Sequence, residues 1–219
     1  MASEIKANKI SPATGTAFTI GDSGDTFTVP SGATIVNSGT ATGFGGGAWN
    51  IISTAVASNS ASLIFTGIVS TYDSYVLTWA DIVPQTDGQM LGIRYGDAGG
   101  IDSGGSDYSI NRSITYVNST VSDYGTTGRN FIDVSKDEGN TSGEGCSGRA
   151  YLHSLMNGSI YPSLDFQTYS SPSNATYKPA SYTGSGMLNA SMTVTQVQLI
   201  FSSGNITSGR ATLYGIAHA

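Results

Sequence analysis

Charged residues are scarce in this sequence: Asp, Glu, Lys and Arg make up 11% of 219 residues, against about 25% in ordinary globular proteins. The net charge is −6 and Lys and Arg do not cluster, which argues against nucleic-acid binding through a basic surface. A single cysteine, Cys146, excludes an intramolecular disulfide, and no Cys/His spacing is typical of zinc. No run of 18 apolar residues indicates a membrane span, and the opening MASEIKANKI lacks the apolar segment of a secretory signal. We therefore expect a protein made in a cytosol, without membrane insertion and without cofactor or metal.

Glycine and aromatic residues are abundant instead. The chain has 29 Gly, where average usage would give about 15. It also has 12 Tyr, 7 Phe and 2 Trp, whereas disordered chains are depleted in aromatics. We expect residues 50–219 to fold into short strands joined by tight turns.

Strand-like runs alternate with turn signals from Trp49 to the C-terminus. They include NIISTAVAS, ASLIFTGI, SYVLTWADIV, QMLGIRYG, YSINRSITYV, RAYLHSLM, SIYPSLDFQTY, TVTQVQLIF and RATLYGIAHA. The last two show apolar–polar alternation, with GNITSG as the turn between them, and no window shows a helical apolar stripe. About ten strands in about 170 residues favour an all-β, antiparallel β-sandwich of jelly-roll type.

Candidates for catalysis are weak. The segment IDSGGS, residues 101–106, resembles the surroundings of the nucleophilic serine in trypsin-like proteases. That chemistry needs a base beside Ser103, but both histidines, His153 and His218, follow it without that family's histidine motif. We interpret the segment as a glycine-rich loop. Cys146 and His153 are a formal nucleophile–base pair, seven residues apart across a loop–strand junction, and we expect Cys146 to be an inert buried residue.

Acidic and aromatic residues give further candidate sites. Two groups of carboxylates, of the kind a glycosidase would need, are Asp97, Asp102 and Asp107, and Asp133, Asp137 and Glu138. We expect both groups to be solvated loop acids. Asp22 and Asp25 in GDSGD lack the ligand density of a calcium loop, and are better explained as turn residues. Exposed tyrosines suit recognition of sugars, and the candidate receptor-facing loop residues are Tyr95, Asp102, Tyr108 and Tyr124.

Residues 15–47 form a repeat-like ribbon that ends in the glycine run 45–47. Its apolar residues, which we expect to form a stem core, are Phe18, Ile20, Phe27, Val29 and Ile35. Ordering each backbone residue costs about 1–2 kcal/mol, and burying a Phe or Ile returns only about 1.5–3 kcal/mol. The ribbon must therefore pack on the large domain or on identical copies around an axis, and the glycine run favours the second. We expect three segments: a tail at 1–14, a stem at 15–47 and a sandwich at 48–219.

The segment AFTIGDSGDTFTVPSGATIVNSGTATGFG resembles repeat-bearing segments of fibre and appendage proteins in tailed bacteriophages, particularly phages of marine bacteria. The opening MASEIKANKISPATGTAFT is similar to them too. The stretches ASLIFTGIVSTYDSYVLTWADIVPQTDGQMLGIRYGD and ITSGRATLYGI resemble the C-terminal modules attached to such stems. The resemblance implies a homotrimeric, intertwined β-prism stem, a trimeric β-sandwich and no enzymatic activity. It also implies attachment to the virion through residues 1–14, where Ile5 and Ile10 are the large apolar anchors.

The resemblance leads us to expect a virion surface protein that assembles in the host cytoplasm. Its expected partners are copies of itself, other virion proteins and a host surface glycan or protein. Because 219 residues is short for a main tail fibre, a head fibre or capsid decoration protein is the alternative. A glycan-cleaving tailspike is a third hypothesis.

Overall fold

The computed structural model describes residues 10–12, 14–17, 19–34, 36, 48–117, 121–174 and 179–217. The chain divides into two compact units, Met1–Phe44 and Gly45–Ala219. In their described parts no helix is long and apolar enough to cross a membrane. The predicted segments 1–14, 15–47 and 48–219 stay a prediction.

The described residues of the first unit form turns and irregular extended chain. In one turn, Asp25 N donates to Asp22 O at 3.0 Å, and the Asp25 carboxylate accepts a bond from Asp22 N at 2.8 Å. This geometry confirms that GDSGD is a turn. A second turn is closed by Ala33 N donating to Pro30 O at 3.0 Å.

The large apolar side chains that the structure describes in the first unit are uncovered in the single chain. Ile20 is 65% exposed and Phe27 66%, while Val29 and Ile10 are also exposed. Phe18, Ile35 and Ile5 lie outside the described residues. The predicted stem core therefore stays a prediction.

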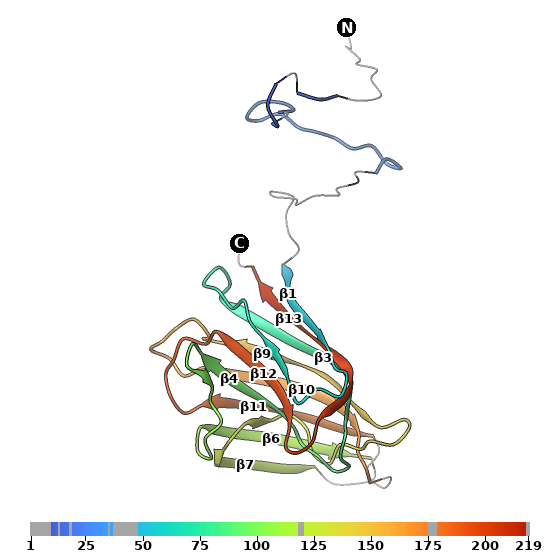
Figure 1. Ribbon diagram of the computed structural model, residues 1–219, viewed down its shortest axis with the longest axis vertical. Coiled ribbons are helices and arrows are strands. Elements are labelled where there is room, and N and C mark those ends of the chain that lie inside the picture. The colour runs from blue at the N-terminus through green and yellow to red at the C-terminus, as the bar shows by residue number, and fades with distance from the viewer. Residues whose placement is uncertain are drawn as a thin grey trace. The chain divides into compact units, whose positions relative to one another are not determined.

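The second unit consists of antiparallel strands in two sheets (Figure 1). The strands are β1 (Trp49–Val56), β2 (Leu63–Phe65), β3 (Ser74–Pro84), β4 (Leu91–Asp97), β5 (Gly100–Ile101), β6 (Tyr108–Tyr116), β7 (Ser122–Arg129), β8 (Ile132–Asp133), β9 (Gly145–His153), β10 (Ser163–Ser171), β11 (Ala180–Leu188), β12 (Gln196–Phe201) and β13 (Ile206–Ile216). The large sheet has the order β1-β13-β3-β9-β10-β11-β6-β7. The small sheet has the order β2-β12-β4-β5, with β8 paired to β4. The predicted all-β, antiparallel architecture is confirmed.

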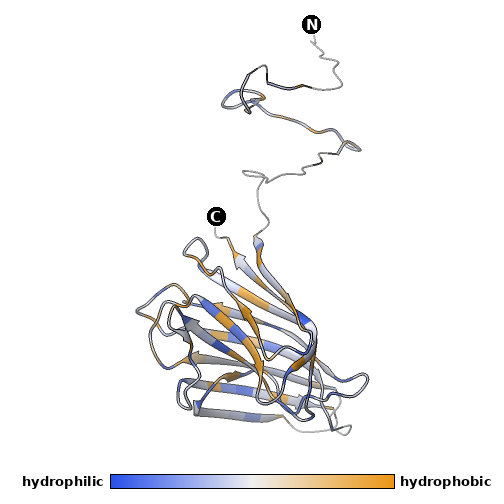
Figure 2. Ribbon diagram, in the orientation of Figure 1, coloured by the Kyte–Doolittle hydropathy of each residue, from blue (hydrophilic) through white to orange (hydrophobic). Residues whose placement is uncertain are grey.

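The core lies between the two sheets. Figure 2 shows apolar and polar residues interleaved along the strands, as expected when one face of each strand is buried. Leu77, Leu152 and Tyr182 of the large sheet belong to one buried cluster with Ile93 and Leu199 of the small sheet. The strands β9, β10 and β11 follow one another in sequence and in space, whereas β12 and β13 carry the chain from the small sheet to the large one.

Part of the glycine content serves this core directly. A Cβ at Gly148 would lie 2.7 Å from the Trp79 ring, and one at Gly215 would lie 2.5 Å from the Tyr72 ring. A Cβ at Gly92 would likewise collide with the ring of Phe131. These aromatic rings therefore lie against bare backbone, which no larger residue would permit.

Candidate functional site

The outer face of the large sheet carries many exposed side chains, although Val76 on this face is covered by its neighbours. Its strand register places the outward residues of neighbouring strands in rows. One row runs through Ile51, Tyr214, Val76, Tyr151, Asp165, Ser185, Asn111 and Gly125. The β1 end of this row is apolar and aromatic, and the β7 end is polar.

A shallow groove of about 620 Å³ lies over the polar half of this face, across strands β6, β7, β9, β10 and β11. We call it the polar groove. Its lining includes Ser109, Asn111, Thr126, His153, Ser163, Asp165, Ser185 and Met187. Gly125 also lines it, and an added Cβ there would have no neighbour closer than 3.8 Å, so the missing side chain helps to keep the groove open.

Polar side chains in the groove are held by one another. His153 Nε2 lies 2.8 Å from Asp165 Oδ1, and Ser185 Oγ donates to Asn111 Oδ1 at 3.2 Å. Ser109 Oγ donates to Asn189 Oδ1 at 2.7 Å. Hydroxyl, amide, imidazole and carboxylate groups thus lie side by side on strands about 4.8 Å apart. Most of the exposed lining around these groups is apolar, so the groove offers a ligand both hydrogen-bonding groups and carbon surface.

Ser163 and His153 are opposite each other in the β9–β10 ladder. In the described part of the chain no hydrogen bond joins the Ser163 hydroxyl to the imidazole, which contacts Asp165 instead. The groove thus brings together a serine, a histidine and an aspartate without the serine–histidine contact by which a base activates a nucleophile.

Cys146 and His153, the candidate nucleophile and base, lie on opposite faces of the large sheet. Cys146 is buried, and His153 lies on the outer face seven residues along the same strand. An odd separation along a strand places two side chains on opposite faces. Burial raises the pKa of the Cys146 thiol well above its ordinary value, and the nearby Glu138 adds a smaller increase. Cys146 is a buried residue, as predicted, while His218 lies outside the described residues.

The loop that carries Ser103 is held by its own acids. Asp97 Oδ1 accepts a bond from Gly99 N at 2.7 Å, and Asp107 accepts one from Gly104 N. Asp102 is half-buried, and its pKa is raised by burial and then by Asp107 and Asp97. Ser103 is exposed in this loop, so the structure supports the interpretation as a turn-rich connection.

Two of the four residues predicted to face a receptor are buried. Tyr95 and Tyr108 are 0% exposed, and they lie in strands β4 and β6 rather than in loops. The Tyr108 hydroxyl accepts a bond from Tyr95 N at 2.8 Å and lies 3.0 Å from Asp102 O, to which it donates. The Tyr95 hydroxyl donates to Ser163 O at 2.9 Å. The prediction is wrong for both, because their hydroxyl groups form hydrogen bonds with buried backbone groups and are not exposed to a receptor.

The other two predicted residues are at least partly accessible. Tyr124 is 40% exposed, with the Arg112 guanidinium carbon 4.9 Å from its ring centre. Asp102 is half-buried. Neither lines the polar groove, so the structure does not bring the four predicted residues together.

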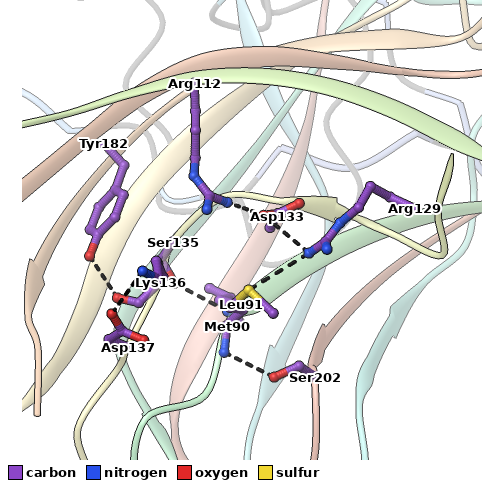
Figure 3. A network of polar contacts seen from close by, with 10 residues as sticks. All are labelled: Met90, Leu91, Arg112, Arg129, Asp133, Ser135, Lys136, Asp137, Tyr182 and Ser202. Carbon is purple, nitrogen blue, oxygen red and sulfur yellow. Dashed lines mark hydrogen bonds and ion pairs between the residues drawn. The ribbon is translucent and has the colours of Figure 1, made fainter. Parts of the chain in front are cut away.

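A buried ionic network joins β6, β7 and β8, and the sequence analysis missed it (Figure 3). Asp133 is 0% exposed and pairs with Arg112 and with Arg129, whose Nη2 lies 3.3 Å from Asp133 Oδ2. The expectation that Asp133 is a solvated loop acid is therefore wrong. The alternation in YSINRSITYV could have indicated the network, because Arg112 occupies an alternate position with Ile110 and Ile114 and therefore points inward with them.

Glu138 is a second buried acid, also contrary to expectation. It is 0% exposed, and Ser170 Oγ donates to its Oε2 at 2.7 Å. Burial raises the pKa of Glu138 to about 7. Hydrogen bonds from Ser170 and Ser135 lower this pKa, but their effect is smaller than that of burial. Asp137 is partly exposed and pairs with Lys136 at 3.4 Å. These carboxylates are divided between the interior and the surface, so they do not form the facing pair of a glycosidase.

Within the described residues, no three His, Cys, Asp or Glu side chains are grouped so as to hold a metal ion. The polar groove, which gathers hydroxyl, amide, imidazole and carboxylate groups on neighbouring strands, is the candidate site. Comparison with protein-family models, curated proteins and solved structures found no match to the chain.

Proposed function

We propose that the protein is a non-enzymatic structural protein of a tailed-bacteriophage virion. In this proposal the first unit is a homotrimeric, intertwined β-prism stem whose N-terminal segment binds other virion proteins. The second unit is a jelly-roll-like head that contributes to host-surface attachment. The protein is then a surface appendage that assembles in the host cytoplasm.

The observation that carries the proposal is the uncovered apolar surface of the first unit. Ile20, Phe27 and Val29 are all exposed in the single chain. Fully burying a Phe or Ile contributes about 1.5–3 kcal/mol, and three chains packed around one axis would each supply the partners that the others lack. The resemblance of this segment to phage fibre stems supports the same assembly.

The polar groove supports the attachment role. Its neighbouring hydroxyl, amide and carboxylate groups, with Asn111 and Asp165 at the centre, match the hydroxyl groups of a glycan. Bacterial surfaces are covered by polysaccharides, so a glycan is the receptor class that the groove fits best. No step of covalent chemistry is needed for this role.

Sedimentation and labelling test the assembly and the location. A trimer would sediment at about 67 kDa, three times the chain mass of 22.5 kDa. Gold-labelled antibodies on intact particles should mark the tail. Labelling over the head would instead favour a decoration or head-fibre role, and a 22.5 kDa species at all concentrations would refute the fibre.

Glycan binding is tested with purified polysaccharide from the host surface. The parent protein should bind it, and Asn111→Ala should weaken binding about 5–20-fold, as expected for the loss of one or two hydrogen bonds. Thr115→Ala is a matched control, because Thr115 is exposed on the same strand and outside the groove. Release of shorter oligosaccharides from the polysaccharide would refute the non-enzymatic proposal and favour a tailspike.

A further inference from the structure

Strand β1 forms an edge of the large sheet with an unusual composition. It pairs only with β13, and its sequence WNIISTAV contains no charge and no proline. Exposed edge strands are normally protected by charged residues, proline or bulges. The protection within β1 is one register shift between Ile51 and Ser53. An edge of this kind favours association.

The outer face beside this edge is an aromatic platform, which we call the β1 patch: Trp49, Ile51, Val56, Tyr151 and Tyr214. The Trp49 ring centre lies 5.6 Å from that of Tyr214 and 6.2 Å from that of Tyr151. Ile51 and Val56 stand out from the platform, 69% and 70% exposed. Contiguous apolar surface rich in Trp and Tyr is typical of protein–protein interfaces.

The patch itself carries no charged side chain. The neighbouring outward residues of β13 and β3 are Arg210, Thr212, Ile216, Val76, Thr78 and Ala80. Arg210 is the one charged residue in this set, and around Tyr151 on β9 the charged residues Arg149 and Asp165 lie on the same face. The Thr54 and Thr212 hydroxyls are already bonded to each other at 3.0 Å. An apolar protein surface is the matching partner.

We infer that the β1 patch contacts a second copy of this chain; the inference rests on the trimer of the proposed function. Trp49 follows the end of the first unit, Phe44, by five residues. Five extended residues span at most about 18 Å. If three first units assemble as proposed, each Trp49 lies within that reach of Phe44 of its own chain, and tethers this short give an effective concentration of the three patches in the millimolar range. Contact between copies then needs little intrinsic affinity.

Trp49 gives a direct readout of this contact. The chain has two tryptophans; Trp79 is buried, while Trp49 is 44% exposed in the single chain. In the full-length oligomer we expect acrylamide to quench neither residue strongly. Strong quenching of Trp49 in a 67 kDa species would overturn the inference and leave the trimer intact.

The test variant is Ile51→Asp and its matched control is Val121→Asp; both replace an exposed aliphatic residue. Val121 lies just before β7, at the opposite edge of the sheet from β1. Sedimentation over a dilution series should show Ile51→Asp dissociating at a concentration at least 10-fold higher than the parent, with Trp49 more accessible to acrylamide. Val121→Asp should match the parent, and circular dichroism should show all three proteins folded. The milder Ile51→Ser is the second variant should Ile51→Asp fail to fold.

Three results would each overturn the inference. The first is an Ile51→Asp oligomer as resistant to dilution as the parent. The second is equal weakening by Val121→Asp, which would show a non-specific effect of charge. The third is binding of the parent to phosphatidylcholine vesicles through Ile51 in place of self-association. A parent that is monomeric throughout would refute the proposed fibre as well, so the two failures are distinguishable.

Discussion

Replacing Glu138 with glutamine should remove a pH-dependent loss of stability from the sandwich. Burial places the pKa of Glu138 at about 7 in the folded chain, against an ordinary value of 4.5. Because the folded-state pKa is the higher one, the contribution to stability is fully present below pH 4.5 and is lost as pH rises through about 7. The full difference of 2.5 pKa units corresponds to about 3 kcal/mol.

The assay is the thermal midpoint of the parent and of Glu138→Gln between pH 5.5 and 8.5, at one protein concentration. This window avoids the isoelectric point near 4.6, where low net charge promotes precipitation. Over it the parent should lose about 2 kcal/mol relative to the variant, or about 4–8 °C in midpoint. The glutamine can still accept the hydrogen bond from Ser170 Oγ, which Glu138 accepts in the parent.

The difference between the two proteins is the informative quantity, because every other titrating group is common to both. Midpoint curves that stay parallel across the window would refute the reasoning. That result would mean that Glu138 is ionised in the folded protein at pH 5.5, and hence hydrated.

Three further substitutions test separate features. Phe27→Asp should dissociate or misassemble the oligomer, and a variant as trimeric and heat-resistant as the parent in sedimentation would count against Phe27 as stem core. Tyr108→Phe should lower the free energy of unfolding by about 1–3 kcal/mol in urea titration, because it leaves the Tyr95 N–H without its partner. Asp133→Ala should cost about 3–5 kcal/mol in the same titration, since it leaves the buried Arg112 uncompensated; an unchanged midpoint would show that the arginine is solvated.

The fold class could be predicted from the sequence because it depends on local signals. Glycine-rich turns and apolar–polar alternation are visible in TVTQVQLIF and RATLYGIAHA, and both are strands, β12 and β13. Strand β7 was missed because SDYGTTGR has no aliphatic residue and mostly exposed positions. It is a strand because β6 offers it a ladder of backbone partners.

The candidate site depended on signals that are not local. The polar groove combines residues of five strands whose order follows long-range pairing, so Asn111 and Asp165 line one groove on either side of Ser185 without any motif between them. The buried acids Asp133 and Glu138 looked like surface residues because their partners, Arg112 and Ser170, are 21 and 32 residues away. Tyr95 and Tyr108 were misplaced for a related reason: an aromatic residue with a polar end satisfies a buried backbone group as well as it does a ligand.

The rows on the outer face have a consequence for how the chemistry of this surface can change. Asn111, Asp165 and Ser185 point away from the core, while the residues that hold the two sheets together occupy the alternate positions of the same strands. Substitutions at the exposed positions of the rows therefore alter the surface chemistry while leaving the packed interior untouched. A sandwich organised in this way separates the residues that keep it folded from those on its outer surface. If the groove binds a host glycan as proposed, single substitutions there would change what it binds without loss of the fold.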